Sequence, residues 1–167
     1  MSMNVTFTRT GERRYRVSVE GPGIEPSYME PAPGYDDRLP HDAAHFIVEN
    51  EIGISGGVFG QLAAGGHANT FRSDARKKPR KTPKRGSSMA KANRDDALFS
   101  EHAVYVASTA WNNAPERPDT KIPPDAVANL CKEFDKFSSR WSKLRVGESI
   151  TLEWKGHRAS MPKRRSK

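Results

Sequence analysis

The sequence predicts an α+β fold, in which a small three-stranded antiparallel sheet is covered on one face by three to four helices. Residues of alternating polarity near both ends of the chain predict the strands, and apolar residues three and four positions apart in the middle predict the helices. The chain has 167 residues and one cysteine, Cys131, which fits a single domain without an internal disulfide.

An N-terminal hairpin supplies two of the expected strands. Val5 and Phe7 alternate with threonines, and Tyr15, Val17 and Val19 alternate with polar residues. This period of two is typical of strands with one buried face. Because an isolated hairpin is marginally stable in water, a third strand is expected to pair with it.

The C-terminal end of the ordered chain supplies that third strand. Ile150, Leu152 and Trp154 alternate with polar residues, and we expect Trp154 to lie on the same face as Phe7. Residues 21–39 contain four prolines and three glycines and are expected to form an extended connection.

Helical periodicity and helix-end signals predict four helices in the middle of the chain. The strongest pattern begins at Pro123-Pro124 and places apolar residues on one stripe as far as Leu144. The other three helices are expected at residues 40–51, 56–64 and 95–112.

Basic residues are concentrated in two blocks. Residues 72–94 carry a net charge of +9 and residues 155–167 carry +6, so the rest of the chain carries −7. Neither block has aliphatic periodicity, and such segments bury too little apolar surface to offset the entropy of ordering. We therefore expect one domain, residues 1–155, interrupted by a disordered loop at 72–93 and followed by a disordered tail at 156–167.

Such charge blocks favour a polyanionic partner, either nucleic acid or an acidic protein. The alternative is that they only keep a linker soluble. No zinc-finger, RNP or homeodomain pattern is present. The candidate nucleic-acid-binding residues are Arg76, Lys77, Lys78, Arg80, Lys81, Lys84, Arg85, Lys163, Arg164 and Arg165.

The N-terminus has no apolar signal segment, and no window approaches the roughly 18 apolar residues of a membrane span. Together with the single cysteine, these features indicate a cytoplasmic protein without a membrane partner.

The segment LPHDAAHFIVENE, residues 39–51, is the most informative chemically. His41 and His45 are four residues apart, so on a helix they share a face and can bind one divalent metal ion. Glu49 is displaced by about 80° around the helix from His41 and is a candidate third ligand. Asp42 is a candidate general base, because His-Asp-x-x-His resembles the zinc-protease pattern His-Glu-x-x-His. Asp42 is one methylene shorter than the Glu of that pattern.

Structural interpretations of the same residues remain open. Both histidines can be satisfied polar groups at the rim of a core, and Asp42 can cap the helix. His67 and His102 are further metal-ligand candidates without informative spacing. The glycine-rich residues 53–66 can cradle a phosphate or, as we favour, form a turn between two helices.

LPHDAAHFIVENEIGISGGVFGQLAAGG, preceded by MEPAPGYDDR and the N-terminal hairpin, resembles a family of small, mostly actinobacterial proteins. Its members share the core Pro-His-Asp-x-x-His-[Phe/Tyr]-x-Val-Glu. The resemblance covers residues 3–71 and implies that His41, Asp42, His45 and Glu49 form the family motif. The family has no established activity, so the resemblance assigns these residues no role.

Three functions therefore compete: a binding or regulatory protein with cationic segments, a metal-binding enzyme of zinc-dependent hydrolytic type, and a purely structural interaction domain. The sequence favours binding over catalysis and requires no cofactor beyond the candidate metal ion.

Overall fold

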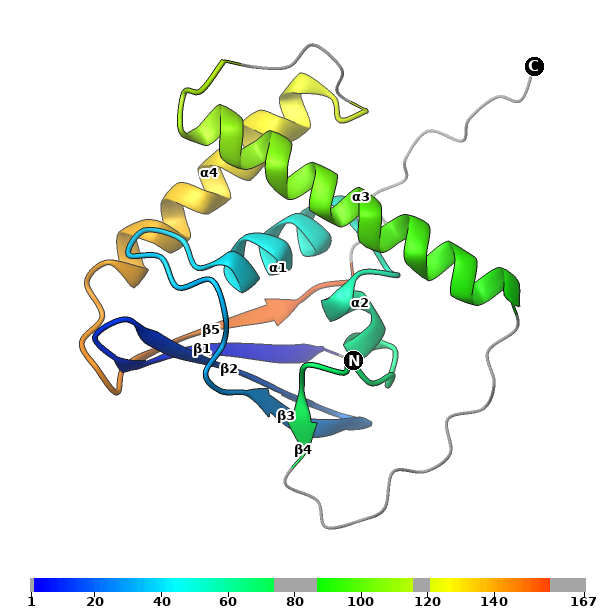
Figure 1. The fold of residues 1–167 in the computed structure, drawn as a ribbon, viewed down its shortest axis with the longest axis horizontal. Helices are drawn as coiled ribbons and strands as arrows, with labels where there is room; N and C mark the ends of the chain where they lie inside the picture. The colour runs from blue at the N-terminus through cyan, green and yellow to red at the C-terminus, as the bar shows by residue number, and fades with distance from the viewer. Residues whose placement is uncertain (1, 74–86, 116–120, 157–167) are drawn as a thin grey trace.

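The computed structural model describes residues 2–73, 87–115 and 121–156 as an α+β fold of five strands and four helices (Figure 1). The strands are β1 Met3–Gly11, β2 Arg14–Gly21, β3 Ile24–Met29, β4 Arg72–Ser73 and β5 Ser149–Trp154. The helices are α1 His41–Ile52, α2 Val58–Ala63, α3 Ser87–Trp111 and α4 Pro124–Trp141.

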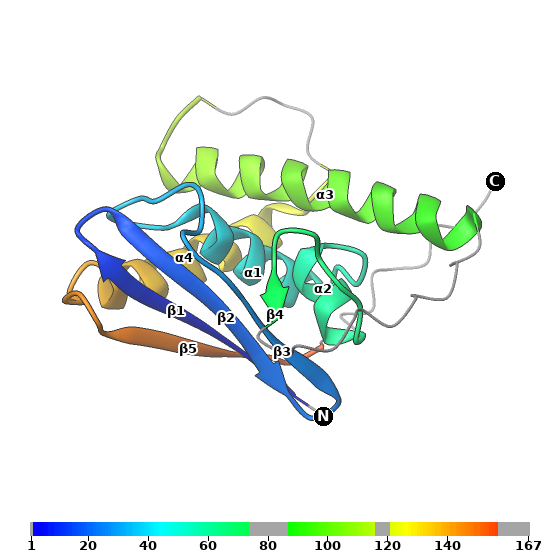
Figure 2. The same ribbon diagram turned by 60° about the horizontal axis from the view of Figure 1, so that its bottom comes forward.

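The five strands form one antiparallel sheet in the order β4-β3-β2-β1-β5. β5, from the far end of the described chain, pairs with β1, so that Phe7 lies opposite Ile150 and Met3 opposite Trp154 (Figure 2). The three predicted strands are therefore β2, β1 and β5, which are neighbours in the sheet. Trp154 and Phe7 are both buried and share the helix-covered face, as expected.

The prediction of only three strands is wrong, because β3 and β4 extend the sheet beyond the hairpin. β3 lies in the stretch expected to be an extended connection. Gly23 has a φ of 73° and makes the turn into β3, and Pro26 lies where the register against β2 shifts. Proline is tolerated in a sheet at such irregularities, so its presence did not exclude a strand.

The helices cover one face of the sheet in two layers (Figures 1 and 2). α1 lies between the sheet and α3, with α4 and α2 beside it. Residues 43–50 are therefore buried in succession, on the side toward the sheet and on the side toward α3. Polar side chains on the second side must find partners on α3, since buried polar groups are costly without them.

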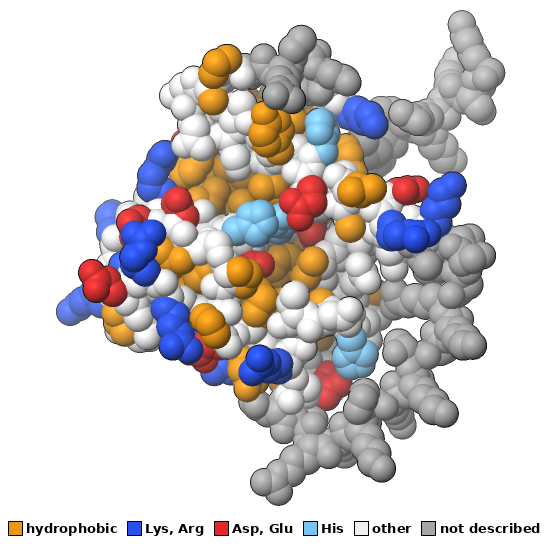
Figure 3. All heavy atoms as spheres, in the orientation of Figure 1, with side chains coloured by type: hydrophobic (Ala, Val, Ile, Leu, Met, Phe, Trp, Pro, Cys, Tyr) orange, Lys and Arg blue, Asp and Glu red, His pale blue; other side chains and the backbone are white. Residues whose placement is uncertain are grey.

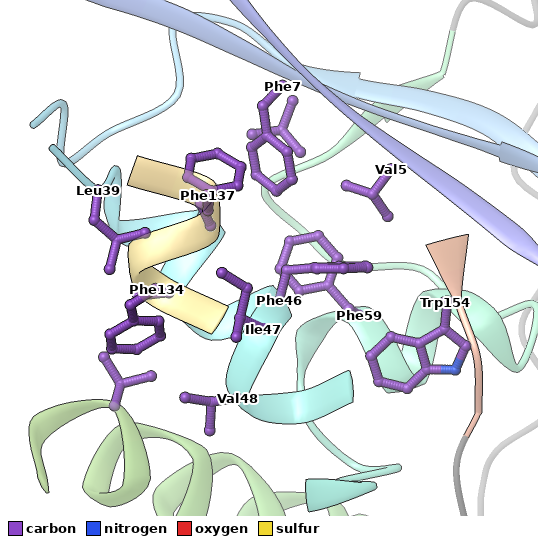
Figure 4. Packing of buried hydrophobic residues seen from close by; sticks show 14 of the residues in the cluster. Val5, Phe7, Leu39, Phe46, Ile47, Val48, Phe59, Phe134, Phe137 and Trp154 are labelled. Atoms are coloured by element: carbon purple, nitrogen blue, oxygen red, sulfur yellow. The ribbon is translucent and has the colours of Figure 1, made fainter. Parts of the chain in front are cut away.

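Aromatic rings pack the helices α1, α2 and α4 against the sheet and against one another (Figure 4). Phe46 of α1 makes edge contacts with Phe7 of β1, Phe59 of α2 and Trp154 of β5, with ring centroids 5.2–6.1 Å apart. Phe137 of α4 makes an edge contact with Phe7. These contacts fix α1 and α4 on the sheet.

The helix ends agree closely with the sequence at α1 and less closely at α3. α1 ends at Gly53, whose φ of 78° is left-handed. α3 begins at Ser87 rather than at Asp95, because alanine and lysine favour a helix there without an apolar stripe. Of the loop expected to be disordered at 72–93, residues 72–73 form β4 and 87–93 belong to α3; residues 74–86 lie outside the described ranges.

The ten candidate nucleic-acid-binding residues and the tail 157–167 also lie outside the described ranges. Within those ranges, no helix combines the length and apolar character that a bilayer crossing requires.

Removing the Trp154 side chain tests the β5 pairing. Trp154→Ala is expected to lower the free energy of unfolding by about 3–5 kcal/mol, since it leaves a cavity beside Phe46. Chemical denaturation measures this loss. Glu153→Ala, on the exposed face of the same strand, is the matched control. Equal stability of the two variants would contradict the packing of β5 against α1.

Candidate metal centre

The first turn of α1 is fixed by the preceding connection. The backbone N–H of His41 donates to the carbonyl of Gly34 at 3.0 Å, and Gly34 has a φ of 69°. A Cβ atom on Gly34 would lie 2.6 Å from Cβ of His41, so this close approach requires glycine. The connection therefore holds the His41 backbone at the start of the helix.

His41, His45 and Glu101 form a cluster between α1 and α3. Their nearest ligand atoms all lie within 4.8 Å of one another. The two Nε2 atoms of the histidines are 3.1 Å apart, and Nε2 of His45 is 3.4 Å from Oε1 of Glu101. His45 is buried, while His41 and Glu101 are exposed. The cluster thus has one buried candidate ligand and two exposed candidate ligands.

The face in view in Figure 3 has histidine side chains beside an acidic side chain near its centre, with hydrophobic side chains around them. Such surroundings strengthen electrostatic interactions compared with open water.

The second nitrogen of His45 is bonded inside the protein. Nδ1 lies 2.9 Å from Oγ of Ser100, which is almost completely buried on α3. Burial lowers the pKa of His45, the Glu101 carboxylate opposes this effect, and the adjacent His41 adds to it. His45 is therefore held in its neutral form at neutral pH, which is the form that binds metals.

Glu49, the expected third ligand, caps α2 instead of joining the two histidines. Its carboxylate accepts the backbone N–H groups of Val58, Phe59 and Gly60 at 3.1, 2.8 and 3.3 Å. It also accepts the hydroxyl of Ser100 at 3.0 Å. Burial raises the pKa of Glu49 to about 7, and these four hydrogen bonds act in the opposite direction.

The glycine-rich turn packs directly against the Glu49 carboxylate. A Cβ atom on Gly57 would lie 2.2 Å from Cδ of Glu49, so a side chain there would displace the carboxylate. The N–H of Gly56 donates to Asp96 of α3 at 2.8 Å. The N–H groups that could cradle a phosphate are thus used by the protein's own carboxylates, and the segment serves as the turn between α1 and α2.

Asp42 faces the sheet rather than the histidine cluster. The single proton of the Tyr15 hydroxyl on β2 has two acceptors within reach, the carboxyl group of Asp42 and, at 2.6 Å, the carbonyl of Pro33. Burial raises the pKa of Asp42, and the Tyr15 hydrogen bond and the charge of His41 lower it. This contact ties the first turn of α1 to the hairpin, so the candidate general base has a structural partner.

Sequence reasoning missed Glu101. It lies far along the chain from His45, and its place on an exposed face of α3 carries no spacing signal. The two further histidine candidates do not join the cluster. His67 is exposed after α2, and His102 lines a cavity of about 420 Å³ with Asp95 and Lys121.

The pKa of Glu49 predicts how its contribution to stability changes with pH. The pKa is about 7 in the folded protein against an ordinary value of 4.5, so the folded state binds the proton more tightly. This contribution is complete below pH 4.5 and is lost as the pH rises through 7, about 3 kcal/mol in all.

The non-titrating variant Glu49→Gln isolates this effect. The free energy of unfolding of the wild-type protein minus that of the variant is expected to decrease between pH 4 and pH 8. Denaturant titrations across this range measure the difference. A difference that stays constant with pH, or increases, would contradict the burial of Glu49.

Comparison with protein-family models, curated proteins and solved structures finds no match for the chain. The resemblance to the bacterial family with the Pro-His-Asp-x-x-His core therefore stays a prediction, and the properties of the site rest on its own geometry.

Proposed function

We propose that this protein binds one divalent transition-metal ion through His41, His45 and Glu101. The observation that carries the proposal is the convergence of three ligand atoms, from two helices, within 4.8 Å of one another. This keeps the histidine pair that the sequence suggested and replaces Glu49 by Glu101 as the oxygen ligand.

The distances support one shared ion. Two donor atoms at zinc–ligand distances of about 2.0–2.2 Å and a tetrahedral angle are separated by about 3.3–3.6 Å. The Nε2 atoms of the two histidines are 3.1 Å apart, and the His45–Glu101 distance is 3.4 Å. The third pair, His41 and Glu101, lies within 4.8 Å, and both of these side chains are exposed, so they can move toward a common centre when an ion binds.

The ligand set supports a reactive site rather than a structural one. Structural zinc sites usually have four protein ligands, whereas two histidines and one carboxylate leave coordination positions open. His41, His45 and Glu101 would hold the ion, and the ion would supply Lewis-acid polarisation of a substrate oxygen and activation of water. We therefore propose metal-assisted hydrolysis as the reaction class.

Metal titration of the untagged protein tests this proposal. The wild-type protein is expected to bind about one equivalent of zinc, measured by competition with a chromophoric chelator. His45→Ala is expected to abolish binding, and Glu101→Gln is expected to weaken it at least about 10-fold, because a neutral amide replaces a charged ligand.

His67→Ala is the matched control, since it removes an exposed histidine outside the cluster and should leave the affinity unchanged. Wild-type protein that binds none of zinc, iron(II) and manganese(II) would contradict the proposed function. Equal binding by wild type and His45→Ala would place the metal elsewhere.

A second proposal rests on the charge distribution. The blocks of +9 and +6 beside a remainder of −7 favour a polyanion as a partner, either nucleic acid or an acidic protein. Lysine and arginine side chains that contact only phosphates do not read bases, so this binding would be independent of sequence.

The salt dependence of DNA binding tests the second proposal. Affinity for duplex DNA is expected to fall steeply between about 50 and 200 mM salt, because each neutralised phosphate releases counterions. Replacing Lys77, Lys78, Arg80, Lys81, Lys84 and Arg85 by Gln should reduce the slope of log affinity against log salt. A slope that is the same in both proteins would exclude this segment as the contact.

A further inference from the structure

We propose that Glu49 and Ser100 are positioning residues that hold His45 as the Nδ1–H tautomer and so direct its Nε2 lone pair toward His41 and Glu101. This inference rests on the proposed metal site and deepens it, since it says what prepares the inner ligand. The inference follows from matching the hydrogen-bond donors and acceptors of the buried side chains Glu49, Ser100 and His45.

The first step is the role of the Glu49 carboxylate. Its partners at Val58, Phe59 and Gly60 are backbone N–H groups, which can only donate. Every one of these contacts therefore requires an acceptor oxygen on Glu49. An ionised carboxylate satisfies all of them, and it also accepts from the hydroxyl of Ser100.

The second step is the single proton of the Ser100 hydroxyl. Oγ lies 3.0 Å from Oε1 of Glu49 and 2.9 Å from Nδ1 of His45, so it bonds to both groups. A hydroxyl donates one hydrogen bond and accepts on its lone pairs. When Glu49 is ionised, as it is at pH 8, its carboxylate accepts this proton, and Nδ1 of His45 is then the donor of the other bond.

The third step concerns the other nitrogen of the ring. A neutral imidazole that carries its proton on Nδ1 has a lone pair on Nε2. In His45 this atom is 3.1 Å from Nε2 of His41 and 3.4 Å from Oε1 of Glu101. The lone pair accepts the Nε2–H of His41 in the metal-free protein and is available to a metal ion when one binds.

Burial makes this arrangement durable. Glu49, Ser100 and His45 are 0%, 1% and 7% exposed. Exchange of their hydrogen-bond partners with solvent is therefore restricted, and each of the three depends on the others. Metal-binding histidines usually donate their second ring N–H to such a partner, which fixes the tautomer and the ring orientation.

The tautomer can be measured without any metal. Long-range proton–nitrogen NMR of the ¹⁵N-histidine-labelled, metal-free wild-type protein at pH 8 distinguishes a protonated Nδ1 from a protonated Nε2. The His45 signals are assigned by their loss in His45→Gln. We expect the Nδ1–H pattern. An Nε2–H pattern would overturn the inference, whether or not the protein binds zinc.

Ser100→Ala removes the link between Glu49 and His45. It is expected to lower the Nδ1–H population of His45 and to weaken zinc binding about 10–100-fold, as is typical for loss of a partner of a metal ligand. Ser108→Ala, the same change two turns along α3, is the matched control. Ser100→Thr, which keeps the hydroxyl, should retain the wild-type tautomer.

The outcomes separate this inference from the proposed function. Nδ1–H in a protein that binds no metal would support the positioning role and contradict the metal site. Zinc binding with equal affinity in wild type and Ser100→Ala would support the metal site and overturn the positioning role.

Discussion

The buried carboxylate of Glu49 is the constraint on which the helical layers depend. This side chain of α1 accepts hydrogen bonds from the backbone N–H groups at the start of α2 and from a serine hydroxyl of α3. It therefore joins three helices at a single point. A negative charge is most easily buried at a helix N-terminus, where the N–H groups have no partners within the helix. Without this acceptor, several buried donors would lose their partner, and each such loss costs about 1–3 kcal/mol.

The central position of α1 explains how polar residues of this one helix form hydrogen bonds with several different elements. Because the helix is covered by the sheet and by α3, each turn presents polar groups to a different element. Asp42 bonds to Tyr15 of the hairpin, His45 to Ser100 of α3, and Glu49 caps α2. Of the candidate residues on this helix, His41 and His45 therefore meet each other, whereas Asp42 and Glu49 are used by other elements.

Periodicity was sufficient to predict the elements whose burial is one-sided. The hairpin, β5 and α4 follow their polarity patterns, whereas β3 tolerates Pro26 at a register shift that no local pattern reveals. At the site, the histidine pair was predictable because both members lie on one helix. Glu101 was not, since it approaches through the packing of α3 on α1, and Gly57 was recognisable as a turn residue but not as the seat of a carboxylate.

The buried residues His45, Ser100 and Glu49 distinguish this cluster from carboxylates and imidazoles that lie close together by chance on a protein surface. When a Glu and a neighbouring His are both exposed, water satisfies their hydrogen bonds, and nothing holds the two side chains close together. Here His45 is almost completely buried and bonded through Ser100 to Glu49. Its second ring nitrogen, Nε2, lies beside the imidazole of His41 and the carboxylate of Glu101, so a cation bound there would be shared by three electron-pair donors. The same buried carboxylate that joins the three helices is thus linked through Ser100 to the buried imidazole of the cluster.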